Sequence, residues 1–455
     1  MGKSAIFFPA SIRSHIIPAT YLAYLLKDEY NIHFSVTGDI FADLVKAQGF
    51  YSFSISEFKP ISRMEAAYLE HIGEKITFGR LVRAINRDEV FNYRRKELKA
   101  LFKHLKPSAI FIDIFVSYEL LSLYELCSGI PIIFFNPMLS TYRVDGFPAV
   151  MEGFWPETKK VEEKKNSISL WHFFSKPRST YVEYLYQRQF KRLAQQPGLI
   201  SDHPIPENIT HTLLFRRFPE CIMAPEELEF DPCIRQDDQT YFGLSISPNR
   251  MDTELDSTYT EKQELINRQK AVGDRVVYVA FGTYFEGANR PFVRFLQTLI
   301  EAFRYIQRVQ VIISVNELVI QTLRHTGDLP PFVYLFSRVP QLEVLELADL
   351  HITHGGMGSI KESIRYAVPM LVYPIEPKWD NDGNALKIAH HQLGLTGSFL
   401  WERSEEMRIK ILRLLSEPVF RENCLRFRET VSQRYSDDQC RERLLRLLQP
   451  QSFAS

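Results

Sequence analysis

The sequence has few cysteines, no net charge and no long hydrophobic run, and each absence excludes a class of protein. Its five cysteines are odd in number and widely spaced, so neither a disulfide framework nor a C-x-x-C zinc motif is expected. Lys plus Arg and Asp plus Glu both number 55, which argues against a nucleic-acid partner bound through overall positive charge. No segment reaches the roughly 18–20 apolar residues that span a bilayer. These features predict a cytoplasmic protein without a transmembrane segment.

The composition is otherwise that of an ordinary globular protein with more than one domain. Hydrophobic residues make up 45% of the 455-residue chain and charged residues 24%. The opening MGKSAIFFPA carries too short an apolar run for a signal peptide and predicts a buried strand. Two basic runs, 94–106 and 159–165, contain interspersed glutamates and favour solvated helix faces. Peripheral contact of these runs with an anionic membrane surface stays open.

The first 135 residues alternate short apolar runs with amphipathic stretches, which is the pattern of a parallel sheet with crossover helices. The runs are rich in β-branched and aromatic residues, as in strands buried on both faces. Strands are expected at 5–9, 33–37, 109–114 and 131–135, and helices at 16–27 and 40–48. A doubly wound α/β domain follows from this order.

The same pattern restarts after a polar crossing at 245–264, which contains a proline and several acidic residues and is typical of a domain junction. Beyond it, 275–283 and 309–315 predict the first strands of a second doubly wound half. We predict a first domain at 1–243, a second domain at 244–435 and a C-terminal tail at 436–455.

The most informative stretch runs from Leu350 to Ala385. An apolar strand leads into His354-Gly355-Gly356, and a helix is expected to begin near Gly358-Ser359. A helix start presents unpaired N–H groups and the positive end of the helix dipole, so it favours an anion without a metal. A second strand leads into a polar loop, 380–384, whose carboxylate and amide groups suit sugar hydroxyls. One strand–helix–strand unit thus offers a phosphate end and a hydroxyl end.

This stretch resembles the donor-site signature of inverting glycosyltransferases of the GT-B fold, the nucleotide-sugar-dependent family that includes plant and bacterial natural-product glucosyltransferases. The family pattern reads roughly W-x-P-Q, then H-x-G-x-x-S with a following Glu, then D-Q-x-x-N-A. The chain has Arg338-Val339-Pro340-Gln341, then His354 to Ser359 with Glu362, then Asp380-Asn381 and Asn384-Ala385. The resemblance implies two Rossmann-like domains facing each other across a cleft, with a C-terminal segment that crosses back onto the first. It also implies acceptor-side helices and loops at about 140–215, where a plain structural insertion is the alternative.

The resemblance assigns donor-binding roles to residues of the second half. His354, Ser359 and the helix-start amides match diphosphate ligands, and Glu362 matches the carboxylate that binds the ribose hydroxyls. Asp380 and Asn381 match the pair that holds the sugar, with Asn in place of the usual Gln. Arg338 stands where many relatives have a Trp that stacks on the nucleobase, and a guanidinium plane can also stack. The expected donor-binding residues are Thr283, Arg338, Val339, Gln341, His354, Gly356, Gly358, Ser359, Glu362, Asp380 and Asn381.

The expected catalytic residues, His15 and Asp113, lie in the first half. Histidine has the ordinary pKa that suits a general base at neutral pH, and His15 is expected in the loop after the first strand, where such sheets bind ligands. The stretch from Ser14 to Pro18 matches the family's G-H-x-x-P, with Ser in place of Gly. Asp113 ends an apolar strand and matches the carboxylate that orients the base.

Other interpretations of these motifs have less support. Asp380-Asn381-Asp382 is formally a D-x-D metal–diphosphate motif, but it follows a complete phosphate-binding helix start, which favours metal independence. A dinucleotide site at 355–358 lacks its third glycine. A nucleotide-sugar 2-epimerase, a glycosyltransferase with a membrane lipid acceptor and a non-catalytic nucleotide-sugar binding protein stay as alternative functions.

The sequence and the resemblance together predict a metal-independent, inverting glycosyltransferase. Its donor is expected to be a nucleotide sugar, with UDP as the first choice of nucleotide. Its acceptor is expected to be a hydroxyl of a small apolar or aromatic molecule. We expect no cofactor besides the nucleotide-sugar cosubstrate, and a protein that is a monomer or a weak dimer.

Overall fold

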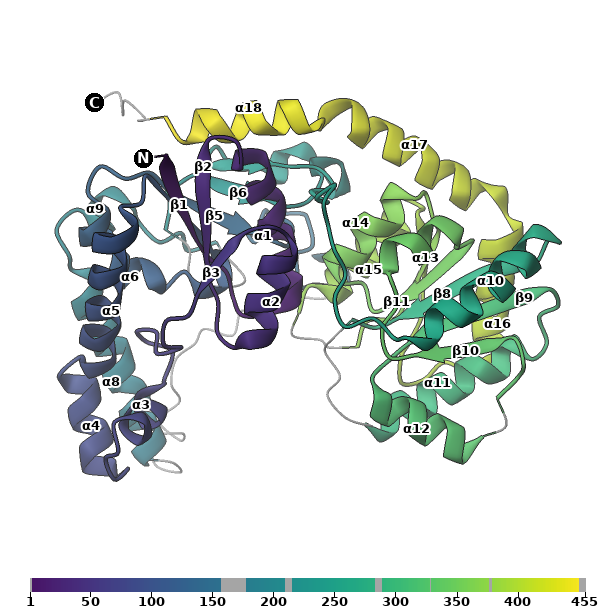
Figure 1. Ribbon diagram of the computed structural model, residues 1–455, viewed down its shortest axis with the longest axis horizontal. Coiled ribbons are helices and arrows are strands. Elements are labelled where there is room, and N and C mark those ends of the chain that lie inside the picture. The colour runs from purple at the N-terminus through teal and green to yellow at the C-terminus, as the bar shows by residue number, and fades with distance from the viewer. Residues whose placement is uncertain are drawn as a thin grey trace.

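Two parallel β-sheets organise the computed structural model, which describes residues 2–156, 177–208, 215–282, 289–327, 329–375 and 379–449. The strand order is β3-β2-β1-β4-β5-β6-β7 in the first sheet and β10-β9-β8-β11-β12-β13 in the second. In both sheets the first and fourth strands in sequence are neighbours, so the chain winds outwards in two directions from that point. The prediction of two doubly wound Rossmann-like halves is therefore confirmed (Figure 1).

The strands are short and lie near the predicted positions. Those of the first sheet are β1 (Lys3–Phe8), β2 (Tyr30–Ser35), β3 (Tyr51–Phe53), β4 (Ala109–Asp113), β5 (Ile132–Asn136), β6 (Glu220–Ile222) and β7 (Gln239–Tyr241). Those of the second sheet are β8 (Arg275–Ala280), β9 (Val309–Ser314), β10 (Val333–Phe336), β11 (Leu350–Thr353), β12 (Met370–Val372) and β13 (Gly394–Thr396).

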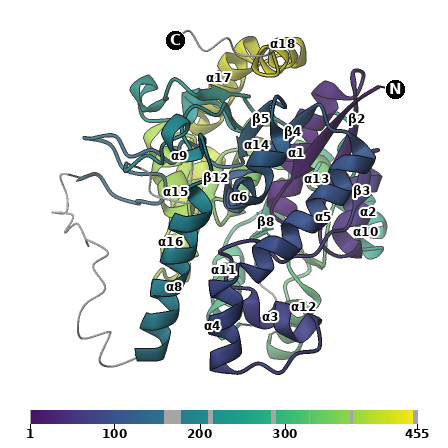
Figure 2. The same cartoon turned by 90° about the vertical axis from the view of Figure 1, so that its left-hand side faces the viewer.

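Helices cover both sheets. The helices of the first half are α1 (Arg13–Leu26), α2 (Asp39–Ala47), α3 (Glu65–His71), α4 (Phe78–Asn86), α5 (Glu89–Leu105), α6 (Glu119–Leu123), α8 (Pro177–Ala194) and α9 (Leu199–Asp202). The later helices are α10 (Thr258–Ala271), α11 (Arg290–Phe303), α12 (Glu317–Thr326), α13 (Gln341–Leu347), α14 (Met357–Arg365), α15 (Asn381–His390), α16 (Ser404–Ser416), α17 (Pro418–Arg434) and α18 (Asp437–Leu447). Figure 2 shows α4 and α8 extending away from the first sheet.

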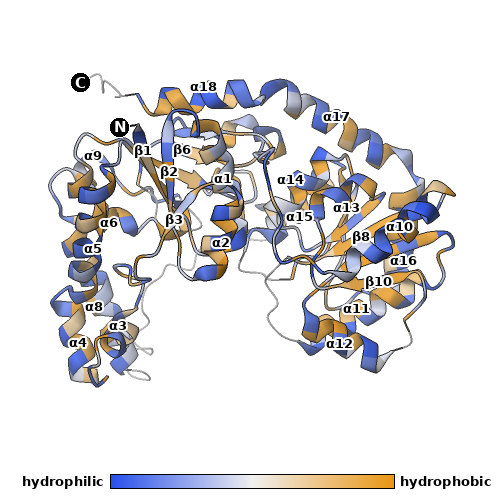
Figure 3. Ribbon diagram, in the orientation of Figure 1, coloured by the Kyte–Doolittle hydropathy of each residue, from blue (hydrophilic) through white to orange (hydrophobic). Residues whose placement is uncertain are grey.

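The apolar runs of the sequence become the cores of the two halves. In the first sheet, Phe7 stacks on Phe111 of the neighbouring β4 with ring centroids 4.3 Å apart, and all of β4 is buried. Hydrophobic residues accordingly concentrate on the strands in Figure 3, while hydrophilic residues are frequent on the outer helices. No helix among the described residues is long and apolar enough to cross a membrane.

Two local expectations need correction. Helix α1 begins at Arg13, three residues earlier than predicted, so His15 lies in the first turn of the helix and not in the loop before it. The predicted polar loop at 380–384 is mostly the first turn of α15, because Asp380 is the residue before its start. In both cases a polar first turn looked like a loop in the sequence, although polar residues also begin helices.

The C-terminal helices connect the two halves. Helix α17 leaves the second half and α18 lies along α1 of the first (Figure 1). There Tyr21 donates a 2.8 Å hydrogen bond from its hydroxyl to Asp437. The interdomain linker, residues 242–257, is a second connection between the halves and leads from β7 to α10. The domain limits at 243 and 435 stay a prediction.

Candidate active site

A cavity of about 700 Å³ lies between the two halves, where the winding of each sheet changes direction. The first half contributes the start of α1 and the segments after β4 and β5, and the second contributes the segments after β8, β11 and β12. The linker between the halves contributes Ser245, Ile246 and Arg250. Of the predicted site residues, those lining the cavity are His15, Gln341, His354, Gly356, Gly358, Ser359, Glu362, Asp380 and Asn381. Motifs far apart in the sequence thus meet in one space.

His15 and Asp113 form a buried pair at the edge of the first sheet. The Nδ1 of His15 lies 2.7 Å from Oδ2 of Asp113, and the carboxylate is fully buried. Asp113 is itself held by the amides of Ala10, at 3.0 Å, and Phe115, at 2.9 Å. An acceptor-only carboxylate at Nδ1 fixes the proton there and leaves Nε2 as the basic nitrogen. The pair therefore has the geometry of an oriented general base.

Aromatic contacts connect the proposed base, His15, to the second half of the protein. The ring of His15 meets Phe115 edge-on at a centroid distance of 4.2 Å. Phe115 in turn stacks on Trp379 at 5.9 Å with an interplanar angle of 11°. Trp379 directly precedes Asp380, so the stack crosses the cavity from the base to the residues expected to hold the sugar.

The turn between β11 and α14 brings backbone to the cavity wall. Gly355 has φ +88°, and a Cβ there would lie 2.7 Å from the Val372 side chain, so only glycine fits. A Cβ on Gly356 would lie 2.6 Å from the ring of His354. The first-turn amides of α14, at Met357 and beyond, have no acceptor within the helix and face an anion favourably.

His354 is neutral at physiological pH. Burial lowers the pKa of its imidazole from the ordinary value to about 4. Its Nδ1 is buried and has no hydrogen-bond partner among the described residues. A neutral imidazole in this position can donate one hydrogen bond to a phosphate oxygen from whichever nitrogen carries the proton.

Two further segments meet this turn. Glu362 on α14 accepts hydrogen bonds from Gln341, the first residue of α13, and from Arg250 of the interdomain linker. On the other side, Asn384 donates 2.8 Å hydrogen bonds to the carbonyl of Gly355 and to the carboxylate of Asp380. Burial raises the pKa of Asp380 above its ordinary value. Hydrogen bonds of Asn384 thus connect the turn between β11 and α14 directly to Asp380, one of the residues expected to bind the sugar.

Two predicted donor residues, Arg338 and Val339, do not line the cavity. Arg338 is not part of the cavity lining, and its guanidinium pairs with Glu254 of the linker at 2.9 Å. Val339 is buried in the hydrophobic cluster that also contains Tyr278. Thr283 lies outside the described residues.

Within the described chain, no group of three or more His, Cys, Asp or Glu side chains could hold a metal ion.

Sequence reasoning did not identify Arg250, Lys361 and Trp379 as lining residues. Trp379 could have been noted from its place before Asp380, and Lys361 from its place before Glu362. Nothing in the sequence marks Arg250, because a linker arginine reaches Glu362 only through the tertiary fold.

Lys361 of α14 is buried at the contact between the second half and the first, and its titration tests that burial. Its ammonium is buried and donates to the carbonyl of Met223, at 2.5 Å, and to the hydroxyl of Ser245, at 2.7 Å. Burial lowers its pKa from 10.5 to about 7. Between these two values the unfolded chain binds more protons than the folded protein, so this group makes stability rise with pH.

We therefore expect the free energy of unfolding of the wild type, minus that of Lys361→Met, to increase by roughly 2–4 kcal/mol from about pH 7 to about pH 10. Urea unfolding of both proteins at several pH values in this range measures the difference between their free energies of unfolding. The contributions of other titrating groups are the same in both proteins and cancel in that difference. A difference that stays constant with pH would contradict the buried ammonium.

Comparisons with known proteins agree with this geometry. Residues 307–446 match the family described as "Erythromycin biosynthesis protein CIII-like, C-terminal domain". The NDP-glycosyltransferase YjiC of Bacillus licheniformis is 36% identical over 106 residues, which cover 23% of this chain and 25% of that protein. The alignments span about a quarter of the length of the first curated relatives.

Solved structures match over nearly the whole chain. The glycotransferase of kitacinnamycin has a TM-score of 0.65 at 17% identity and covers 98% of this chain and 100% of its own. A UDP-glucose: anthocyanidin 3-O-glucosyltransferase in complex with UDP has a TM-score of 0.64 at 18% identity and covers 98% of this chain and 99% of its own. The GT-B fold that the resemblance implied is confirmed.

Proposed function

From its similarity to GT-B glycosyltransferases of the natural-product type, we propose that this protein transfers a sugar from a nucleotide donor to a hydroxyl of a small molecule. The observation that carries the proposal is the shared cavity. It joins an oriented imidazole from one half to a helix start suited to a diphosphate from the other.

In the proposed reaction, Nε2 of His15 accepts the proton of the acceptor hydroxyl as its oxygen attacks the anomeric carbon. The bond from that carbon to the diphosphate oxygen breaks, and the nucleoside diphosphate leaves with the electron pair. Asp113 stabilises the imidazolium that forms. A single displacement of this kind inverts the configuration at the anomeric carbon.

The leaving group needs stabilisation as its negative charge grows. The amides at the start of α14 and a neutral His354 are preorganised donors, which act without rearrangement during the reaction. Ser359 lines the same wall and adds a hydroxyl. Asp380 and Asn381 are assigned to the sugar hydroxyls, and no protein-bound metal is assigned a role.

The donor is proposed to be a UDP- or TDP-sugar and the acceptor an apolar or aromatic molecule. Apolar side chains in the cavity support the acceptor class, since Ile17, Pro18, Met138 and Ile246 line it together with His15. Such a surface binds a hydrophobic acceptor by excluding water, which also protects the donor from hydrolysis.

Incubation of the purified chain with UDP-glucose or TDP-glucose and a panel of phenols tests the proposal. We expect a glycosylated product with inverted anomeric configuration, detected by mass spectrometry and NMR. A donor-only incubation distinguishes the 2-epimerase alternative, because only an epimerase changes the donor without an acceptor. Nucleotide binding with no turnover on any acceptor would contradict the transferase assignment.

A further inference from the structure

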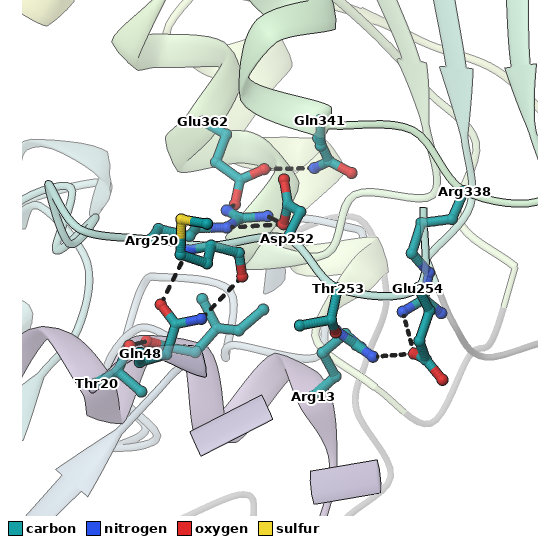
Figure 4. A network of polar contacts seen from close by, with 12 residues as sticks. Arg13, Thr20, Gln48, Arg250, Asp252, Thr253, Glu254, Arg338, Gln341 and Glu362 are labelled. Atoms are coloured by element: carbon teal, nitrogen blue, oxygen red, sulfur yellow. Dashed lines mark hydrogen bonds and ion pairs between the residues drawn. The ribbon is translucent and has the colours of Figure 1, made fainter. Parts of the chain in front are cut away.

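The interdomain linker places one guanidinium at the carboxylate proposed to bind ribose. Arg250 lines the cavity and its side chain is only 7% exposed. It pairs with Asp252 at 3.0 Å and also with Oε1 of Glu362, which lies 112 residues further along the chain. Figure 4 shows Arg250 between these two carboxylates.

The first half of the protein holds this part of the linker in place. Gln48 donates a 2.8 Å hydrogen bond to the carbonyl of Met251 and accepts one of 3.1 Å from its amide. Arg13 donates to the hydroxyl of Thr253 at 3.1 Å. Arg250 is therefore presented to the second half by a segment fixed on both sides (Figure 4).

Both oxygens of Glu362 are already engaged. Oε1 accepts from Arg250 and Oε2 accepts from the side-chain amide of Gln341. Gln341 is itself held, because the hydroxyl of Tyr278 donates to its oxygen at 3.3 Å. The amide of Gln341 is a neutral donor that a ribose hydroxyl can replace at Oε2, whereas Oε1 is held by a charged guanidinium. A ribose whose 2′- and 3′-hydroxyls both bind the carboxylate needs both oxygens, whereas a 2′-deoxyribose needs only one.

Displacing Arg250 to free the second oxygen would be unfavourable. The guanidinium sits in a buried position between Asp252 and Glu362, and breaking a buried charge pair leaves an uncompensated charge. Charge-assisted bonds of this kind are also stronger than a bond from a neutral hydroxyl.

We infer that Arg250 is a specificity-determining residue, which occupies one oxygen of Glu362 and makes the donor site indifferent to the ribose 2′-hydroxyl. Deoxyribonucleotide donors are then bound as well as ribonucleotide donors. This inference rests on the proposed function, since it concerns the nucleotide of the proposed donor.

Calorimetric titration of the full chain with UDP, 2′-deoxyuridine 5′-diphosphate and TDP tests the inference. The first two probes differ only in the 2′-hydroxyl, and the last two only in the base methyl group. For the wild type we expect UDP and its 2′-deoxy form to bind within about threefold of each other, although a hydroxyl bound to a free carboxylate is ordinarily worth about tenfold or more.

In Arg250→Gln, Oε1 of Glu362 loses its charged partner, and the preference for UDP over the 2′-deoxy form is expected to rise to about tenfold. Arg13→Gln is the matched control, because it removes a guanidinium that binds the same linker but not Glu362. Its ratio is expected to equal that of the wild type, because Gln48 still holds the linker at Met251, next to Arg250. The ratio is the measured quantity, so a general loss of affinity does not affect it.

A wild-type preference for UDP above about threefold overturns the inference, and so does an unchanged ratio in a folded Arg250→Gln protein. If this variant does not fold, the ratio of the wild-type affinities for UDP and its 2′-deoxy form is sufficient to decide whether the inference holds. Failure of all three nucleotides to bind overturns the proposed function itself, and the assignment of Arg250 with it.

Discussion

Asparagine in place of His15 is expected to lower kcat/KM for sugar transfer by about a thousandfold, within the range that general bases contribute. The reason is that the substitution removes Nε2, the proposed acceptor of the hydroxyl proton, and an amide is not basic. Asparagine can still donate to the carboxylate of Asp113, which in addition keeps its bonds from the amides of Ala10 and Phe115. The local fold should therefore survive.

Steady-state kinetics and nucleotide calorimetry on the same preparation measure the effect. Donor affinity should stay near the wild-type value, because the proposed nucleotide contacts lie in the other half of the cavity. Asp113→Asn is the companion variant: its amide can stabilise the wrong imidazole tautomer, and a large fall in kcat with intact donor binding is expected. Transfer at the wild-type rate by a folded His15→Asn protein would remove the proposed base.

The second large effect is expected at Gly383, where α15 touches the first half. A Cβ at this position would lie 2.0 Å from the carbonyl oxygen of Val150, and backbone cannot move aside as a flexible side chain does. At the other end of α15, the residue that follows the helix, His391, also contacts the first half, with its Nε2 3.2 Å from the carbonyl of Glu229. Gly383→Ala must therefore push the helix and the loop apart.

We expect Gly383→Ala to reduce the free energy of unfolding by about 3 kcal/mol and to lower transfer, because Asp380 and Asn381 at the start of α15 move with the helix. Chemical unfolding and kinetics measure the two effects. Gly79→Ala is the control: Gly79 also lies in a helix, but a Cβ there meets nothing within 4 Å, and no loss of stability is expected. Equal stability of the two variants would show that the close approach is not required.

The local features of this protein were predictable because short-range physics produces them. Buried strands such as β4 and β5 follow from continuous apolar runs, and the helix start at Met357 follows from the glycines before it. The errors lay at helix beginnings, at Arg13 and Asn381, where a polar first turn has no periodicity that separates it from a loop.

The sequence by itself predicted a doubly wound parallel sheet in each half and the strand end to which each polar motif belongs, because apolar runs that alternate with amphipathic stretches favour parallel strands joined by crossover helices. Only the tertiary structure decided which motifs face each other. In that structure His15 and Asp380 line the same cavity. Arg338 forms an ion pair with Glu254 and does not line the cavity, whereas Arg250 forms one with Glu362 inside it. Such contacts depend on how two separately folded halves pack against a linker, and periodicity along one chain carries no information about that packing.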